Sequence, residues 1–90
     1  QRAFELGMVN KLVEPNTVIE AALDLAQRVC KAAPLAVWAS RKIVLASETE
    51  PDKTLIDMTN KEFGAVLASE DTKEGLTAFI EKRQPNWQGK

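Results

Sequence analysis

Phe79 and Lys82, near the end of the chain, could together hold a ligand. They are three positions apart in a predicted helix, so their side chains would be neighbours on its surface. An aromatic ring beside a long cationic side chain can cover an apolar group and bind a phosphate at the same time. Phe63, in the preceding predicted helix, is a third candidate. The alternative is that both rings are core residues and that Lys82 is solvated surface.

The chain offers few other reactive groups. It has no histidine and one cysteine, Cys30, which would lie on the apolar side of a helix. A cysteine nucleophile needs a base such as histidine, so we interpret Cys30 as a small buried hydrophobic residue. Only scattered carboxylates could bind a metal, and neither a P-loop nor a dinucleotide-binding glycine motif is present. Arg41 and Lys42 form a basic spot, for which solvated charge or an ion pair is favoured over a phosphate contact.

Length and charge argue against several classes of protein. A chain of 90 residues makes at most one domain, and it would be marginally stable on its own. The net charge is -1 with both signs mixed along the chain, which argues against nucleic acid as a partner. No run approaches the ~18 apolar residues of a membrane span. The chain begins at Gln1, inside a predicted helix, so we expect a piece of a longer protein.

The most clearly marked element is the helix predicted for residues 69–83, which is followed by a tail, residues 84–90. Ser69 is a good N-cap because its hydroxyl can accept a hydrogen bond from an early backbone N–H. Acidic residues in the first turns and basic ones in the last suit the helix dipole, and Pro85 prevents further helix. Gly75 costs about 1 kcal/mol relative to alanine, which close approach of another helix or a ligand would offset.

The first residues are predicted to contain the end of a helix and then a strand. The helix covers residues 1–6, and Gly7 follows it as the residue that ends the helix. Residues 8–13 alternate partly between apolar and polar side chains, as in a strand. A strand needs a partner for its backbone groups, and no other segment of the chain resembles one. We therefore expect this strand to complete a sheet formed by residues outside this chain.

Three further helices are predicted, at residues 17–33, 35–47 and 53–68. At the start of the first, Thr17 and Glu20 fit a capping box, in which a hydroxyl and a carboxylate satisfy backbone N–H groups. The second is apolar around most of its circumference, so it needs cover on more than one side. The loop after the third is tight, which predicts that this helix and the last one pair as an antiparallel hairpin.

Three segments resemble the crotonase superfamily, the enoyl-CoA hydratase/isomerase family. Residues 6–13 (LGMVNKLV) resemble a strand of the family, and residues 33–37 (APLAV), with Lys42, resemble the start of a family helix. Residues 69–87 resemble the C-terminal end of family members. The three segments stand in the family's order and at similar spacing, and they cover nearly the whole chain.

This resemblance implies a fold class. Family members have a core of stacked ββα repeats, followed by a C-terminal α-helical region that builds trimers, and the trimers often pair into hexamers. The chain would then be mainly α. Residues 1–14 would be the end of the core, and residues 15–90 would be the C-terminal helical domain, with about four helices. A homotrimer or hexamer is the expected assembly.

The resemblance also implies an activity on acyl-CoA thioesters. In hydratases of the family, two backbone N–H groups stabilise a thioester enolate, and two glutamates activate water for addition across the 2,3 double bond. These groups would lie upstream, so no catalytic residue is assigned in this chain. Coenzyme A would be part of the substrate, with no separate cofactor and no metal. The expected location is the bacterial cytoplasm, or the mitochondrial matrix in a eukaryote.

Phe63, Phe79 and Lys82 match residues that lie beside the acyl-CoA in similar hydratases, often lent across a subunit boundary. The resemblance implies that both rings are apolar walls and that Lys82 contacts a CoA phosphate. Another family enzyme, such as an isomerase or a carnitinyl-CoA-type dehydratase, is an alternative, because the tail also resembles bacterial dehydratases of that type. A non-catalytic helical interaction module is the alternative from a different class.

Overall fold

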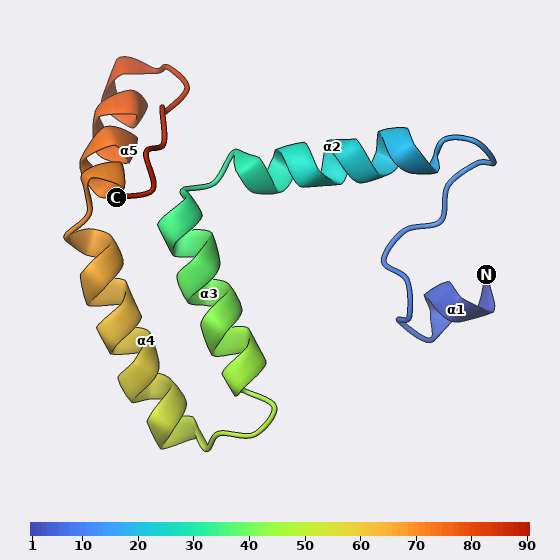
Figure 1. The fold of residues 1–90 in the computed structure, drawn as a ribbon, viewed down its shortest axis with the longest axis horizontal. Helices are drawn as coiled ribbons and strands as arrows, with labels where there is room; N and C mark the ends of the chain where they lie inside the picture. The colour runs from blue at the N-terminus through green and yellow to red at the C-terminus, as the bar shows by residue number, and fades with distance from the viewer.

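The computed structural model describes all 90 residues and contains five helices and no strand (Figure 1). The helices are α1 (Arg2–Glu5), α2 (Val18–Cys30), α3 (Pro34–Ala46), α4 (Asp52–Leu67) and α5 (Glu70–Glu81). Each corresponds to a helix predicted from the sequence, with ends that differ by a few residues at most. The mainly helical fold class is therefore confirmed.

Residues 8–13 are irregular, so the predicted strand is not formed in this chain. A strand is held by hydrogen bonds to a neighbouring strand, and no second strand is present to supply them. Gly7 follows α1 in the left-handed conformation, with φ of 73°, as predicted for the residue after a helix.

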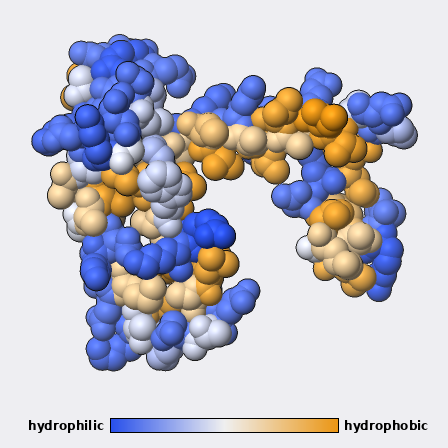
Figure 2. Space-filling view, in the orientation of Figure 1, coloured by the Kyte–Doolittle hydropathy of each residue, from blue (hydrophilic) through white to orange (hydrophobic).

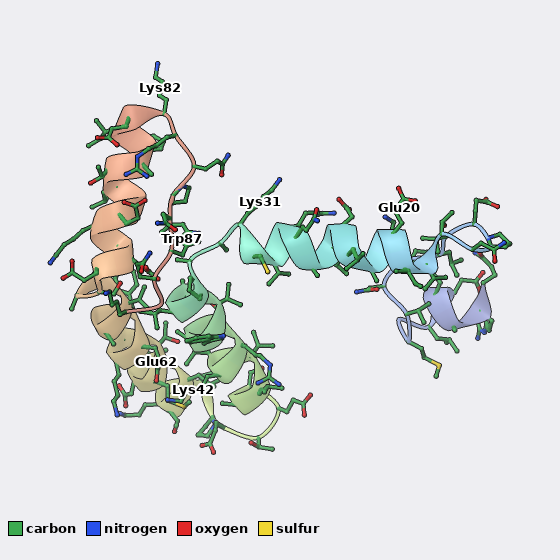
Figure 3. All side chains as sticks on the ribbon, turned by 45° about the horizontal axis from the view of Figure 1, so that its top comes forward. Glu20, Lys31, Lys42, Glu62, Lys82 and Trp87 are labelled. Atoms are coloured by element: carbon green, nitrogen blue, oxygen red, sulfur yellow. The ribbon has the colours of Figure 1, made fainter.

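Helices α3 and α4 form the main packed unit, an antiparallel hairpin (Figure 1). Pro34 occupies the first turn of α3, where its missing N–H and fixed φ do no harm. Lys42 on α3 and Glu62 on α4 form an ion pair across the hairpin (Figure 3). The ion-pair interpretation of this lysine is therefore confirmed.

The predicted hairpin of the last two helices is wrong. Helix α5 continues beyond the end of α4, so the two helices do not lie side by side (Figure 1). The segment that folds back along α5 is the tail, residues 84–90, and not α4. The junction is held by Ser69, whose Oγ accepts a hydrogen bond from the Thr72 N–H at 3.1 Å, as predicted for an N-cap. A short loop fixes where two helices join but not the angle between them, so it did not require a hairpin.

The start of α2 also differs from the prediction. Thr17 precedes the helix, but its hydroxyl donates to the carbonyl oxygen of Glu14 at 2.8 Å and makes no cap. Because threonine hydroxyls can bond to nearby loop backbone, they compete with helix capping. The predicted capping box with Glu20 is not formed.

The helices enclose almost no interior. The radius of gyration is 16.9 Å, whereas a compact domain of this length has about 12 Å. The chain extends over 44 × 39 × 17 Å, so it is little thicker than one layer of helices. Ala78 is the only buried apolar residue, and apolar side chains lie open along α2 (Figure 2). Cys30, predicted to be buried, is exposed because α2 reaches away from the other helices (Figure 1).

Candidate functional site

Helix α5 ends in a turn that fixes the backbone of Lys82. The Lys82 N–H donates to the carbonyl oxygen of Phe79 at 3.3 Å, and the Arg83 N–H donates to that of Ala78 at 3.0 Å. These two bonds define a Schellman motif, in which the residue just after the helix is left-handed. Lys82 takes that conformation, with φ of 55°. The helix ends at Glu81, two residues earlier than predicted, so Lys82 leaves from the turn and not from the helix surface.

Phe79 and Lys82 both face solvent within the chain. Lys82 points away from the end of α5 (Figure 3) and forms no ion pair, because the carboxylates of Glu74 and Glu81 are both paired with Arg83. Phe79 is 84% exposed, more than any other large hydrophobic residue of the chain. The ring and the cation are thus both free to contact a molecule outside the chain.

Phe63 lies elsewhere, in a groove between α3 and α4. The groove has a volume of about 160 Å³ and is lined mainly by apolar side chains, among them Ala36, Ala39, Ile43 and Val66. Phe79 and Lys82 do not line it. Phe79 and Lys82 are thus linked through their backbones at the end of α5, whereas Phe63 lies apart from them.

Two carboxylates hold the tail along α5 through its backbone. Asp71, which is 1% exposed, accepts hydrogen bonds from the N–H of Gln88 at Oδ1 (2.7 Å) and of Gly89 at Oδ2 (2.9 Å). Glu74 accepts one from the N–H of Asn86 at Oε1 (2.7 Å). Hydrogen bonds to a charged acceptor are shorter and stronger than neutral ones. These two carboxylates therefore fix three of the seven tail residues through their backbone N–H groups.

Arg83 ties Glu74 to the turn that holds Lys82. Its Nη1 and Nη2 donate to Oε1 and Oε2 of Glu74 at 2.6 and 3.0 Å, and its Nε donates to Glu81 at 2.6 Å. The Arg83 hydrogen bond, followed by that from the Asn86 backbone, lowers the pKa of Glu74 from 4.5 to about 2. The same pairing raises the pKa of Arg83 above its usual value. Both groups are therefore charged at any pH near neutral.

Trp87 connects the tail to the junction between α2 and α3. Its Nε1 donates to the carbonyl oxygen of Lys31 at 3.0 Å (Figure 3). Its ring lies over Gly75, where an added Cβ would be 3.1 Å from Cη2 and 3.3 Å from Cζ3. The close approach predicted from a glycine inside the helix is therefore present. The neighbour is an indole ring of the same chain and not another helix or a ligand.

Sequence reasoning assigns Asp71 and Glu74 only to the helix dipole and misses their hold on the tail. The hydrogen bonds span between 12 and 18 positions along the chain, so no short-range periodicity reveals them. Two signals were available. Gly75 is a costly residue inside a helix, and Trp87 is a large aromatic residue in a segment with no helix of its own to pack against.

A model of the enoyl-CoA hydratase/isomerase family matches residues 1–90, the whole chain. The chain belongs to this family. The resemblance recognised in the sequence is thereby confirmed.

None of the helices of this chain combines the length and the apolar character that crossing a membrane requires.

Relatives in the enoyl-CoA hydratase/isomerase family are similar along the whole chain. The carnitinyl-CoA dehydratase of Salmonella arizonae is 37% identical and aligns with 99% of this chain and 36% of its own length. The enoyl-CoA hydratase structure from Mycobacterium tuberculosis H37Rv is 42% identical, with a TM-score of 0.91 over 99% of this chain and 35% of that one. A Bacillus anthracis enoyl-CoA hydratase has a TM-score of 0.93 at 29% identity. The chain thus spans little more than a third of the length of the relatives it matches.

Proposed function

We propose that this chain is the C-terminal, acyl-CoA-covering and oligomerising part of an enoyl-CoA hydratase, a lyase that adds water to the 2,3 double bond of enoyl-CoA thioesters. One observation supports this most. The chain matches the family along its full length, yet it leaves most of its large apolar side chains exposed and buries none of them fully. Exposed apolar surface of this extent indicates contact with other protein surface or a ligand.

The proposed contact with substrate is at Phe79 and Lys82, with Phe63 as a further wall. The phenyl ring of Phe79 has no cover within the chain, and the ammonium of Lys82 has no counter-ion there. A ring beside an unpaired cation suits a ligand that has an apolar part and a phosphate. Acyl-CoA has both. Phe63 would contribute from the groove between α3 and α4.

The same proposal assigns different roles to the core and to the C-terminal helical domain. Residues 1–14 belong with the core of the longer protein, and residues 15–90 form its C-terminal helical domain. The groups that stabilise the enolate and activate water lie in the core, so this chain contributes none of them. The assembly is a homotrimer or hexamer in the cytoplasm, with a role in fatty acid metabolism, and its apolar helices α2 and α3 supply contact surface.

A carnitinyl-CoA-type dehydratase is the second candidate, because curated relatives of that name are 35–37% identical to the chain. The test is to assay the full-length protein in parallel on a short-chain enoyl-CoA, a carnitinyl-CoA and a 3-enoyl-CoA. Hydration of the first at the highest kcat/KM supports the proposal. A preference for the second or third assigns the dehydratase or the isomerase. If the full-length protein turns over no acyl-CoA and residues 1–90 alone form a stable, monomeric, folded protein, the non-catalytic interaction module would be supported.

A further inference from the structure

The tail, residues 84–90, joins parts of the chain that otherwise barely touch. On one side it is bonded to Asp71 and Glu74 of α5, and on the other Trp87 bonds to Lys31, at the end of α2. Near its end, Gly89 lies close to Pro34 at the start of α3, since an added Cβ would be 3.8 Å from the proline Cγ. Helix α5 contacts α4 only where the two join, so the tail is its principal support.

We propose that the tail is a strap that locks α5 against the α2–α3 corner, and that Asp71 and Glu74 are positioning residues for Phe79 and Lys82. The strap itself is a feature of this chain alone. Its effect on substrate rests on the proposed acyl-CoA role of Phe79 and Lys82. The strap and that role therefore need separate measurements.

The contacts of the strap explain how it could set the position of Lys82. Glu74 is held by the side chain of Arg83, and Arg83 is the next residue after Lys82. The same oxygen of Glu74 that accepts from Arg83 Nη1 also accepts from the Asn86 N–H. Glu74 therefore holds both the tail and Arg83, so loss of its carboxylate frees the tail and the turn from which Lys82 projects.

Asp71 holds the far end of the strap. Its two oxygens accept from successive N–H groups, those of Gln88 and Gly89, and its own N–H donates to the carbonyl oxygen of Lys90 at 3.1 Å. Asp71 therefore binds the backbone of the tail and not its side chains. It is also the only buried charged group of the chain, and a buried carboxylate is stabilised by hydrogen bonds of this kind.

The first experiment measures the strap without substrate. Amide hydrogen exchange in the full-length protein should show protection at Asn86, Gln88 and Gly89. Asp71→Asn and Glu74→Gln should raise those exchange rates by about tenfold or more while leaving α3 and α4 protected. Glu70→Gln is the matched control, because Glu70 is an acid of the same helix that pairs with Lys73 and forms no hydrogen bond to the tail. Wild-type protein with unprotected amides at these three positions would overturn the strap, whatever the substrate.

The second experiment measures its effect on Lys82. KM for an acyl-CoA is compared between wild type and Asp71→Asn, in the presence of Lys82 and again in a Lys82→Ala background. Misplacing Lys82 cannot cost more than removing it, so Asp71→Asn should raise KM by between two- and about tenfold with Lys82 present and much less without it. Equal effects in both backgrounds would mean that Asp71 does not act through Lys82, and would overturn its positioning role.

The two experiments distinguish failure of the strap from failure of the proposed acyl-CoA role of Lys82. Protected tail amides with a Lys82→Ala variant that binds acyl-CoA as well as wild type would leave the strap standing and contradict the acyl-CoA role of Lys82. Trp87→Phe supplies a milder variant that keeps an aromatic ring over Gly75 and loses the bond to Lys31. Its tail amides should exchange faster than in wild type and slower than in Asp71→Asn, and unchanged exchange would contradict the anchoring to the α2–α3 corner.

Discussion

At the scale of single residues, the conformation of Lys82 is unfavourable for a lysine. A residue with a Cβ in the left-handed region costs about 1–2 kcal/mol, and glycine is the usual residue at this position after a helix. Lys82 nevertheless stands there with φ of 55° and with its ammonium in solvent. Because a glycine would make a more stable turn, the proposed contact of the lysine with a CoA phosphate would give this residue a role that a glycine lacks.

This gives a prediction that separates ligand binding from stability. In the full-length protein, Lys82→Ala and Lys82→Gly should each raise KM for acyl-CoA by roughly tenfold with little change in kcat, since a remote phosphate contact binds ground and transition states alike. Lys82→Gly should also raise the free energy of unfolding by ~0.5–1 kcal/mol. Steady-state kinetics and chemical denaturation measure the two effects.

The controls for Lys82 concern charge and substrate. Lys73→Ala removes the same charge from α5 at a residue paired with Glu70, and it should leave KM unchanged. The loss at Lys82 should shrink as salt rises, because an exposed phosphate contact is screened. A pantetheine thioester lacks the nucleotide end of CoA, so its KM should be the same for wild type and for Lys82→Ala. If pantetheine and CoA substrates are weakened equally, Lys82 has a structural role only.

The acid stability of the chain should depend on Glu74. Its pKa is lowered to about 2 in the folded protein and is near 4.5 when unfolded. The stabilisation is therefore present in full above pH 4.5 and is lost as the pH falls toward 2. Glu74→Gln should thus be destabilising at neutral pH, and the difference from wild type should narrow through this window. Denaturation curves at a series of pH values measure it, and a difference that stays constant down to pH 2 would contradict the ionic hold of Arg83 on Glu74.

At the scale of elements, the pairing of α5 with the tail can be tested at Gly75. In an open helix, glycine to alanine raises stability by about 1 kcal/mol. Here the new Cβ would meet the Trp87 ring, so Gly75→Ala should instead lower the free energy of unfolding by ~1–2 kcal/mol. In a Trp87→Leu background the sign should reverse. Gly64→Ala is the control and should stabilise, because an added Cβ there would meet no side chain or neighbouring segment of the chain within 4 Å.

Local patterns were sufficient to predict the helices but not their arrangement. The spacing of apolar residues, Pro34 and the Ser69 cap are all read within a few positions of the chain, and they predicted α3, α4 and α5 correctly. The pairing of α5 depends on hydrogen bonds 12 or more positions apart, which no local pattern encodes. For the same reason, Phe79 and Lys82 could be identified as candidates from spacing and family resemblance, whereas the positioning contacts of Asp71 and Glu74 could not.

At the scale of the whole molecule, α3 is the helix for which we most expect burial by other protein surface. Trp38 on this helix is 61% exposed within the chain, although α3 packs against α4. In the full-length assembly we expect other protein surface to bury it. Trp38→Glu would then bury an unpaired charge, and it should lower the melting temperature by roughly 5 °C or more and weaken assembly. Lys61→Glu, an exposed change on α4, is the control. An unchanged oligomer on sizing and an unchanged melting temperature would show that Trp38 is not covered.

The open shape of the chain, with a radius of gyration of 16.9 Å and one buried apolar residue, indicates that its helices are covered by further protein surface. The most direct test is the hydration of a short-chain enoyl-CoA, measured side by side with the full-length protein and with residues 1–90 alone. The full-length protein should turn over the substrate, and the chain alone should do no better than buffer, because the proposed oxyanion hole and catalytic glutamates lie outside it. Turnover by residues 1–90 alone, or none by the full-length protein, would contradict the proposal.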